Sequence, residues 1–344
     1  MIEKTDIGKE ELLTGYRNLV MERFMDKKLL NASKQGFLPF YIPLMGHEAI
    51  HIGIGLALRD NDYFYPYYRD FGTVLQKGIP LDMIMSQVFS TQDDNELGRD
   101  MPDHFSFKKY NIGAVITPVA GHLTSATGIA YAYQYRKKEG SIIATFGDGA
   151  TSTPDFHVAM NFAGVYNLPM VFFCENNGFA ISVPTYPTEN GAFDQTYEET
   201  RGQIYKKAEA YGFNGIRIDG TNFVEVYRQT RKALENAKNG PILIEAMTYR
   251  MGPHSTADDP NKYRTNTVTE GSEKDPVIAS QKVLKDMGIL DDKAIESIND
   301  EMDKKSTDLI NKYEKEPKPD KHTILDNLYE ENPWYIDEEK GDIQ

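Results

Sequence analysis

Two kinds of hydrophobic spacing alternate along the chain, and this alternation predicts its architecture. Apolar residues with helical spacing occupy one face of a segment from about residue 10 to residue 30. From residue 124 onward, helical and strand-like patterns follow one another in turn. The predicted order is helix 125–138, strand 141–146, helix 155–166, strand 170–175, a helix from 201 to about 210, strand 215–218, helix 222–237 and strand 241–247. Such alternation is typical of a parallel sheet covered by helices.

The C-terminal part has a different pattern, dominated by charged amphipathic segments. Helices are predicted at 277–289 and 301–316, followed by a proline-containing break and a short tail. We expect these helices to cover a sheet edge or a partner. The predicted division is an N-terminal helical segment at 1–60, an α/β core at 61–270 and a C-terminal extension at 271–344.

Composition narrows the class of protein. The chain has 344 residues and a formal charge of -14, which argues against nucleic acid as the main ligand. No apolar run approaches the roughly 18 residues of a membrane span. The lone cysteine, Cys174, excludes an internal disulfide, and the first residues lack an apolar signal region, so a cytoplasmic location is expected.

Polar side chains follow two neighbouring strands of the predicted sheet. Asp148 stands between Gly147 and Gly149 after strand 141–146, and Asn177 follows strand 170–175. They are 29 residues apart (177 minus 148), the span of one strand–helix–strand crossover. The glycines allow close backbone approach, and a helix beginning nearby offers N–H groups to phosphate. Because a carboxylate repels phosphate, Mg²⁺ bridging the two is the consistent arrangement.

This combination resembles the thiamine diphosphate motif, and the resemblance extends over nearly the whole chain. The sequence is similar to the α subunit of the decarboxylating component of 2-oxoacid dehydrogenase complexes, most closely to the branched-chain type. The motifs that carry it are GRDMP at 98–102, GDGATS at 147–152, MNFAGV at 160–165, FFCENNGFAIS at 172–182, LIEAMTYRMGPHSTADD at 243–259 and LYEENP at 328–333. The resemblance implies a thiamine diphosphate-binding, Rossmann-like three-layer sandwich with a parallel sheet.

The resemblance also implies roles for individual residues. It makes Asp148, Asn177 and the main-chain carbonyl of Phe179 the Mg²⁺ ligands, and His254 the histidine beside the thiazolium, supported by Arg250. The remaining cofactor-binding positions are Tyr68 and Arg69 at the diphosphate, and Thr117, Val119, Gly147, Gly149 and Ala150. The positions that match the acyl pocket are Phe40, Tyr41 and Val119.

The implied activity is decarboxylation of a branched-chain 2-oxoacid and transfer of the acyl group to lipoyl on an acyltransferase core. The glutamate that activates the cofactor belongs to a separate β subunit, so two α and two β chains are expected to assemble. Pyruvate and acetoin remain alternative substrates. A non-catalytic scaffold subunit is the alternative from another class, and the retained metal and diphosphate residues argue against it.

Several residues depart from the family or stay open. His47 and His51 are four apart on a predicted helix, but no third zinc ligand follows at a plausible spacing, so we expect helix packing. His104 and His122 are candidates to line the pocket; His122, with Gly121, replaces the Thr-Gln of a potassium site, which argues against a monovalent ion. Ser255 matches a serine that is phosphorylated in organellar relatives, and we expect the unmodified form.

Proline at residue 154 is a further departure. Relatives commonly have Glu-Gly where this chain has Thr153-Pro154. Proline is tolerated in the first turn of a helix, so we expect little effect on the fold.

Overall fold

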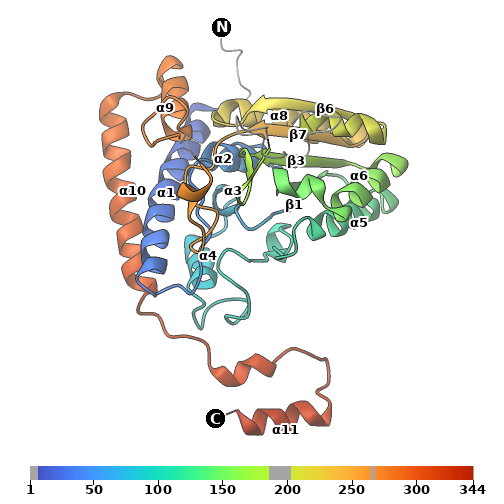
Figure 1. Cartoon of the computed structure of the whole chain (residues 1–344), viewed down its shortest axis with the longest axis vertical. Coiled ribbons are helices and arrows are strands. Elements are labelled where there is room, and N and C mark those ends of the chain that lie inside the picture. Colours follow the sequence, from blue (N-terminus) through green and yellow to red (C-terminus); the bar gives the residue numbers. More distant parts are fainter. Residues whose placement is uncertain (1–6, 186–202, 265–267, 344) are drawn as a thin grey trace.

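The computed structural model describes residues 7–185, 203–264 and 268–343. It contains a five-stranded parallel sheet between two layers of helices (Figure 1). The strand order is β1-β2-β3-β7-β6. The bounds are β1 Tyr63–Tyr65, β2 Ile142–Gly147, β3 Met170–Asn176, β7 Ile242–Met247 and β6 Asn214–Asp219. The predicted three-layer α/β fold is therefore confirmed.

The central strands are buried on both faces, as expected for a parallel sheet with helices on either side. All seven residues of β3 are buried, and successive side chains enter two different cores. Val171 and Phe173 belong to the larger core, whereas Phe172 and Cys174 belong to the smaller one. This explains why strands 141–146 and 170–175 appear in the sequence as continuous apolar runs.

The larger core lies under the N-terminal helices and the helices that follow β6 and β7. Its helices are α1 (Lys9–Lys34), α2 (Glu48–Ala57), α3 (Phe71–Gln76), α4 (Leu81–Val88), α8 (Phe223–Asn236), α9 (Pro276–Asp286) and α10 (Asp292–Tyr313). In Figure 1, α10 runs alongside α1 at the side of the molecule. The predicted C-terminal helices thus extend the layer that α1 begins.

The smaller core is covered by α5 (Gly121–Tyr135), α6 (Pro154–Tyr166) and the 3-10 helix η3 (Ile204–Tyr211). Pro154 is the first residue of α6, and the hydroxyl of Thr153 accepts a hydrogen bond from the Phe156 N–H. The departure from the family at these positions therefore leaves a well-capped helix start, as predicted.

The structure adds elements that hydrophobic spacing did not predict. The short strand β1 lies in the tyrosine-rich segment 62–72 and pairs in parallel with β2. A terminal helix, α11 (Trp334–Asp342), follows the 3-10 helix η6 (Lys321–Leu325) in an arm that extends away from the sheet (Figure 1). The helix expected from residue 201 lies partly outside the described residues.

The described helices include none with the length and apolar character needed to cross a membrane. The larger core contains side chains from all three predicted parts of the chain, from Ile7 to Tyr313. The predicted division at residues 60 and 270 stays a prediction.

A buried carboxylate joins α1 to the segment that leads into α2. Asp26 accepts hydrogen bonds from the Tyr41 hydroxyl at 2.8 Å, the Leu44 N–H at 2.7 Å and the Met45 N–H at 3.1 Å. Burial raises the pKa of Asp26 to about 6 despite these three donors, which favour the ionised form. This acceptor fixes the path of the backbone just before His47.

We predict that Asp26→Asn lowers the free energy of unfolding by about 1–3 kcal/mol, because the amide turns an N–H₂ group toward backbone donors that it cannot satisfy. Urea denaturation monitored by circular dichroism measures the change. Tyr41→Phe, which removes a single donor, is the matched control, with an expected cost of about 0.5–1.5 kcal/mol. An Asp26→Asn protein as stable as the wild type would contradict this role.

Candidate functional site

A cavity of about 290 Å³ opens at the carboxyl ends of β2 and β3. This is the edge at which open parallel sheets bind ligands. The predicted cofactor residues that line it are Tyr68, Arg69, Val119, Gly147, Asp148, Gly149, Ala150, Asn177, Phe179, Arg250 and His254. The structure therefore brings together eleven positions from five separate stretches of sequence.

The three predicted metal ligands lie on neighbouring turns. Gly147 pairs with Glu175 in the β2–β3 register, so Asp148 and Asn177 continue from adjacent strand ends. The Asp148 carboxylate accepts a hydrogen bond from the Thr185 hydroxyl at 2.6 Å. The Asn177 amide oxygen accepts one from the Phe179 N–H at 3.1 Å, which closes a tight turn. A carboxylate, an amide oxygen and a main-chain carbonyl form an all-oxygen donor set, as Mg²⁺ requires.

Backbone groups line the opposite side of this turn. After Asp148 the chain forms a short 3-10 helix, η2 (Asp148–Ser152), and then enters α6 at Pro154. Gly147 has open space where a Cβ would stand, and Gly149 and Ala150 line the cavity. The free N–H groups at the start of a helix suit an anion such as phosphate.

Two buried arginines give the cavity wall positive charge. Arg69 and Arg250 are almost fully buried, and the Nε atom of each has no hydrogen-bond partner among the described residues. Arg250 donates to the carbonyls of Phe179 and Ile181 and to the Tyr263 hydroxyl. Within residues 7–185, 203–264 and 268–343, no carboxylate is bonded to Arg69, so its guanidinium can bind an anionic ligand in the cavity.

His254 lies beside these arginines and is held by its own loop. The main-chain N–H of His254 donates to the Asp258 carboxylate at 2.7 Å, and the same carboxylate accepts a hydrogen bond from the Tyr263 hydroxyl at 2.6 Å. Its Nδ1 is 3.4 Å from an Arg69 nitrogen. Burial, together with the charges of Arg69 and Arg250, lowers the pKa of His254 to about 3. The imidazole is therefore neutral at physiological pH.

Three predicted positions do not reach the cavity wall. Thr117 is exposed, although its neighbours Ile116 and Pro118 line the cavity. Phe40 and Tyr41 lie beside the His254 loop instead, since the Thr256 N–H donates to the Tyr41 carbonyl at 3.0 Å. The Tyr41 side chain is in the core, bonded to Asp26.

Other residues of the wall were not named from sequence. Tyr67 and Phe146 line the cavity directly beside a predicted residue in the chain, and Thr153 and Ile181 line it within three residues of one. Of the two open histidines, His122 lines the cavity, and His104 stacks against the ring of Tyr68. Adjacency to a motif was the available signal for the first group, whereas nothing in the sequence separated the two histidines.

Ser255 is buried, with its hydroxyl accepting a long hydrogen bond from the Ala257 N–H. It therefore packs inside the loop that carries His254.

The pair of histidines on α2 has a third polar neighbour that the sequence did not show. Glu175, from β3, approaches both His47 and His51, and all three side chains are buried. Their potential ligand atoms lie within 4.8 Å of one another. Both histidines are packed in the interior, as expected, but the predicted absence of a third possible ligand was wrong, because Glu175 is 128 residues away from His47 in sequence and only the fold brings them together.

Comparisons with known proteins show relatives that match most of the chain. The chain is 36% identical over 325 residues to the 2-oxoisovalerate dehydrogenase subunit alpha of Bacillus subtilis, covering 93% of this chain and 96% of that protein. The mitochondrial subunit of the same name from Caenorhabditis elegans is 34% identical, with 98% of this chain and 77% of that protein covered. The human one is 33% identical, with 96% and 73% covered.

A family model matches most of the chain as well. It is described as the dehydrogenase E1 component and aligns with residues 16–322. This range includes the strands of the sheet and the residues of the cavity named above. With the relatives, it shows that the chain belongs to the dehydrogenase E1 component family.

Proposed function

We propose that this chain is the α subunit of a thiamine diphosphate-dependent 2-oxoacid dehydrogenase that acts on branched-chain 2-oxoacids and passes the acyl group to a lipoyl group. The family depends on thiamine diphosphate. The observation that carries the proposal is the cavity that Asp148, Asn177 and Phe179 line together with Arg69 and His254. The relatives are named for 2-oxoisovalerate, which supports the branched-chain substrate.

The chain's own residues account for binding of the diphosphate. Asp148, Asn177 and the Phe179 carbonyl would hold Mg²⁺, and Arg69 with the backbone around Gly149 would hold the phosphate oxygens. A carbonyl oxygen has two lone pairs, so Phe179 can accept from Arg250 and still bind a metal. The donor set thus fits a metal-bridged diphosphate.

Thiamine diphosphate, when bound, supplies the electron sink that decarboxylation of a 2-oxoacid needs. The protein's contribution is to orient the reactants and exclude water. Arg69 donates toward Nδ1 of His254, so in the neutral ring the proton lies on Nε2. His254 therefore offers an N–H donor at Nε2, suited to an anionic group of substrate or cofactor.

The cavity lacks one group that the proposed reaction requires. Among the described residues that line it, Asp148 is the only carboxylate, and it is assigned to the metal. This supports assigning the glutamate that activates the cofactor to another chain, as the family resemblance implies. We infer a β subunit that covers the mouth of the cavity, in an assembly of two α and two β chains, with an acyltransferase core as acceptor of the acyl group.

An exposed apolar face supports a second subunit. On α5 and α6 the rings of Tyr131, Phe162 and Tyr166 contact one another, with centroids 4.5 to 5.9 Å apart, and each is partly exposed. Val165 beside them is 70% exposed. Both helices begin near the cavity, next to Val119 and Thr153, which line it. A partner on this face would therefore cover α5 and α6, the two helices whose first residues follow the cavity wall.

Apolar side chains of the wall fit an aliphatic acyl group. Ile116, Val119, Phe146 and Ile181 line the cavity. One methylene is worth only about 1–3 kcal/mol in such a pocket, so selection among branched acids is expected to be modest.

The first prediction concerns activity. Purified with its β subunit, the chain is expected to decarboxylate 3-methyl-2-oxobutanoate and 4-methyl-2-oxopentanoate faster than pyruvate, in a reaction that needs Mg²⁺ and thiamine diphosphate. Asp148→Ala should lower kcat/KM by about 100-fold or more. Even the loss of a residue that only hydrogen-bonds to a metal ligand typically lowers metal affinity or activity by about 10- to 100-fold.

Leu328→Ala, in the exposed C-terminal arm, is the control variant for this assay. Faster reaction with pyruvate would leave the proposed mechanism standing and would make pyruvate the proposed substrate. Full activity of the α chain alone would overturn the assignment of the catalytic glutamate to a second subunit.

The second prediction concerns the charge of His254. In the cofactor-free chain the His254 imidazole should stay neutral at pH 5, with its proton on Nε2. Its pKa is lowered from the ordinary value of 6.5 to about 3, so the ring is protonated only at a much lower pH than a free histidine. Long-range ¹H–¹⁵N spectra, assigned with His254→Gln, report the charge and the tautomer. An imidazolium at pH 6 would contradict the role of the two arginines. Bound diphosphate should raise the pKa, since it offsets their charge.

The third prediction concerns the partner face. Val165→Asp should weaken co-purification with the β subunit by about 100-fold or more, because burying an unpaired carboxylate costs several kcal/mol. Phe37→Asp, at another exposed apolar side chain, is the matched control and should leave assembly unchanged. Analytical ultracentrifugation of the two variants with β measures the difference. Equal assembly of both would show that this face is not the interface.

A further inference from the structure

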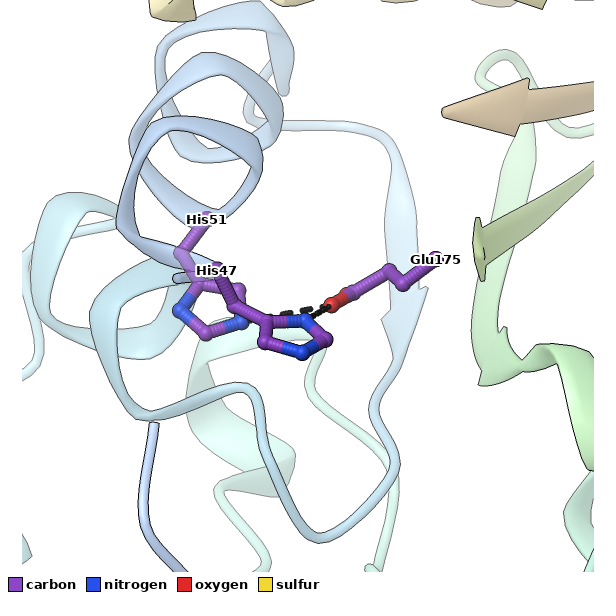
Figure 2. A group of neighbouring side chains, drawn as sticks. All are labelled: His47, His51 and Glu175. Carbon is purple, nitrogen blue, oxygen red and sulfur yellow. Dashed lines mark hydrogen bonds and ion pairs between the residues drawn. The ribbon is translucent and has the colours of Figure 1, made fainter. Parts of the chain in front are cut away.

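Five buried polar side chains form a continuous row from α1 to the edge of the cavity. In order they are Glu22, His51, Glu175, His47 and Asn177, and each is at most 5% exposed. Figure 2 shows His47 and His51 extending from the α2 segment toward the Glu175 carboxylate. The row ends at Asn177, one of the proposed metal ligands.

The chemistry of each group determines where the protons lie. The Glu175 carboxylate is 2.6 Å from Nδ1 of His47, so that nitrogen carries a proton and donates it. In a neutral imidazole, Nε2 is then an acceptor. The Asn177 side-chain atom that faces Nε2 at 3.4 Å must therefore be its N–H₂ group. The amide oxygen consequently points the other way, where it accepts from the Phe179 N–H.

We propose that His47 is a positioning residue that selects the orientation of the Asn177 amide, so that its oxygen rather than its nitrogen faces the metal. The proposal rests on the proposed function, since it presumes Mg²⁺ at Asp148, Asn177 and Phe179. An asparagine amide has two nearly isosteric ends, and only the oxygen binds a cation. His47, as a second hydrogen-bond partner, distinguishes the oxygen end of the Asn177 amide from its nitrogen end. It thereby excludes the orientation in which the nitrogen would face the metal.

His51 and Tyr67 keep Glu175 an acceptor. Both ring nitrogens of His51 lie near carboxylates, Nδ1 at 2.5 Å from Glu22 and Nε2 at 3.5 Å from Glu175, an arrangement that favours the protonated ring. The Tyr67 hydroxyl donates to the same Glu175 oxygen at 2.9 Å. Donors from α2 and from the segment after β1 thus hold Glu175 ionised, and an ionised Glu175 fixes the tautomer of His47.

The same histidines and Glu175 have a separation that suits a zinc ion. A metal on Nδ1 of His47 would move the ring proton to Nε2, which would then oppose the N–H₂ group of Asn177. That amide cannot turn over without facing its own N–H₂ group toward the Phe179 N–H. The hydrogen bonds therefore favour a proton at this position over a metal.

The test measures Mg²⁺ binding rather than turnover. Isothermal titration of the α/β complex with Mg²⁺, at saturating thiamine diphosphate, gives the metal affinity. His47→Leu removes both hydrogen bonds and should weaken Mg²⁺ by about 10- to 100-fold, the usual effect of losing a partner that orients a ligand. His47→Gln retains one donor and one acceptor and should stay within about threefold of the wild type. Where His47→Leu fails to assemble, the flexible His47→Met replaces it.

Two controls separate a positioning effect from general damage. Tyr16→Phe removes a buried hydrogen bond between α1 and α9, from the Gln281 side chain to the Tyr16 hydroxyl, at a residue that does not line the cavity, and should leave Mg²⁺ affinity unchanged. Asp148→Ala should abolish Mg²⁺ binding. If it does while His47→Leu binds Mg²⁺ as the wild type does, the positioning role is wrong and the metal site stands.

If Asp148→Ala also leaves binding unchanged, the proposed metal site itself is wrong. Elemental analysis of the purified complex addresses the remaining alternative. One zinc per α chain in the wild type that is absent from His47→Leu would overturn the proposal in favour of a zinc site.

Discussion

The parallel pairing of β2 with β3 is the constraint on which the site depends. Ile142 pairs with Met170, an offset of 28 residues (170 minus 142), and the offset persists to Gly147 and Glu175. Asp148 and Asn177 are 29 residues apart, so Asn177 lies one residue beyond the position that this register would pair with Asp148. A shift of one residue in this register would reverse the side chains of β3, sending Phe173 and Glu175 toward the opposite core. The register that buries the apolar residues is therefore also the one that forms the site.

Charge balance is the second organising feature. Arg69 and Arg250 line the cavity and bond to no carboxylate in the part of the chain that the structure describes. The buried Glu22 and Glu175 have His51 between them. The His51 pKa is raised well above its usual value by these carboxylates, whereas burial lowers the His47 pKa to about 4. The two histidines are one helical turn apart and yet differ in charge. His51 favours the protonated form because it lies between two carboxylates, whereas His47 favours the neutral form because it is buried against one carboxylate and an amide.

Close backbone packing connects this buried row to the loop that carries His254. Gly46, just before His47, has a φ of 106°, and a Cβ there would be 1.9 Å from the Tyr249 carbonyl oxygen. The Met251 N–H donates to the Met45 carbonyl at 2.9 Å. Only glycine fits this approach. The α2 segment and the His254 loop are therefore positioned together, and both meet the sheet at the same edge.

Hydrophobic spacing and local motifs determined much from the sequence alone. The order of helices and parallel strands after residue 124 follows from apolar runs, because a strand buried on both faces requires apolar side chains at every position. The GDG turn and the Asn-Asn-Gly turn indicated the proposed metal residues, because their separation equals one crossover. The strand β1 was not predicted, because three residues within a tyrosine-rich segment are too few to show a periodic pattern.

Only the tertiary structure decided which distant groups meet. The pairing of His47 with Glu175 spans 128 residues, and the contact of Arg69 with His254 spans 185. No local pattern encodes such a contact, because it arises where the packing of α2 and the His254 loop against the sheet brings their side chains to one place. Protonation states follow the same rule. Sequence establishes that a histidine is present, whereas its burial and charged neighbours, which the fold supplies, decide whether it is neutral or charged.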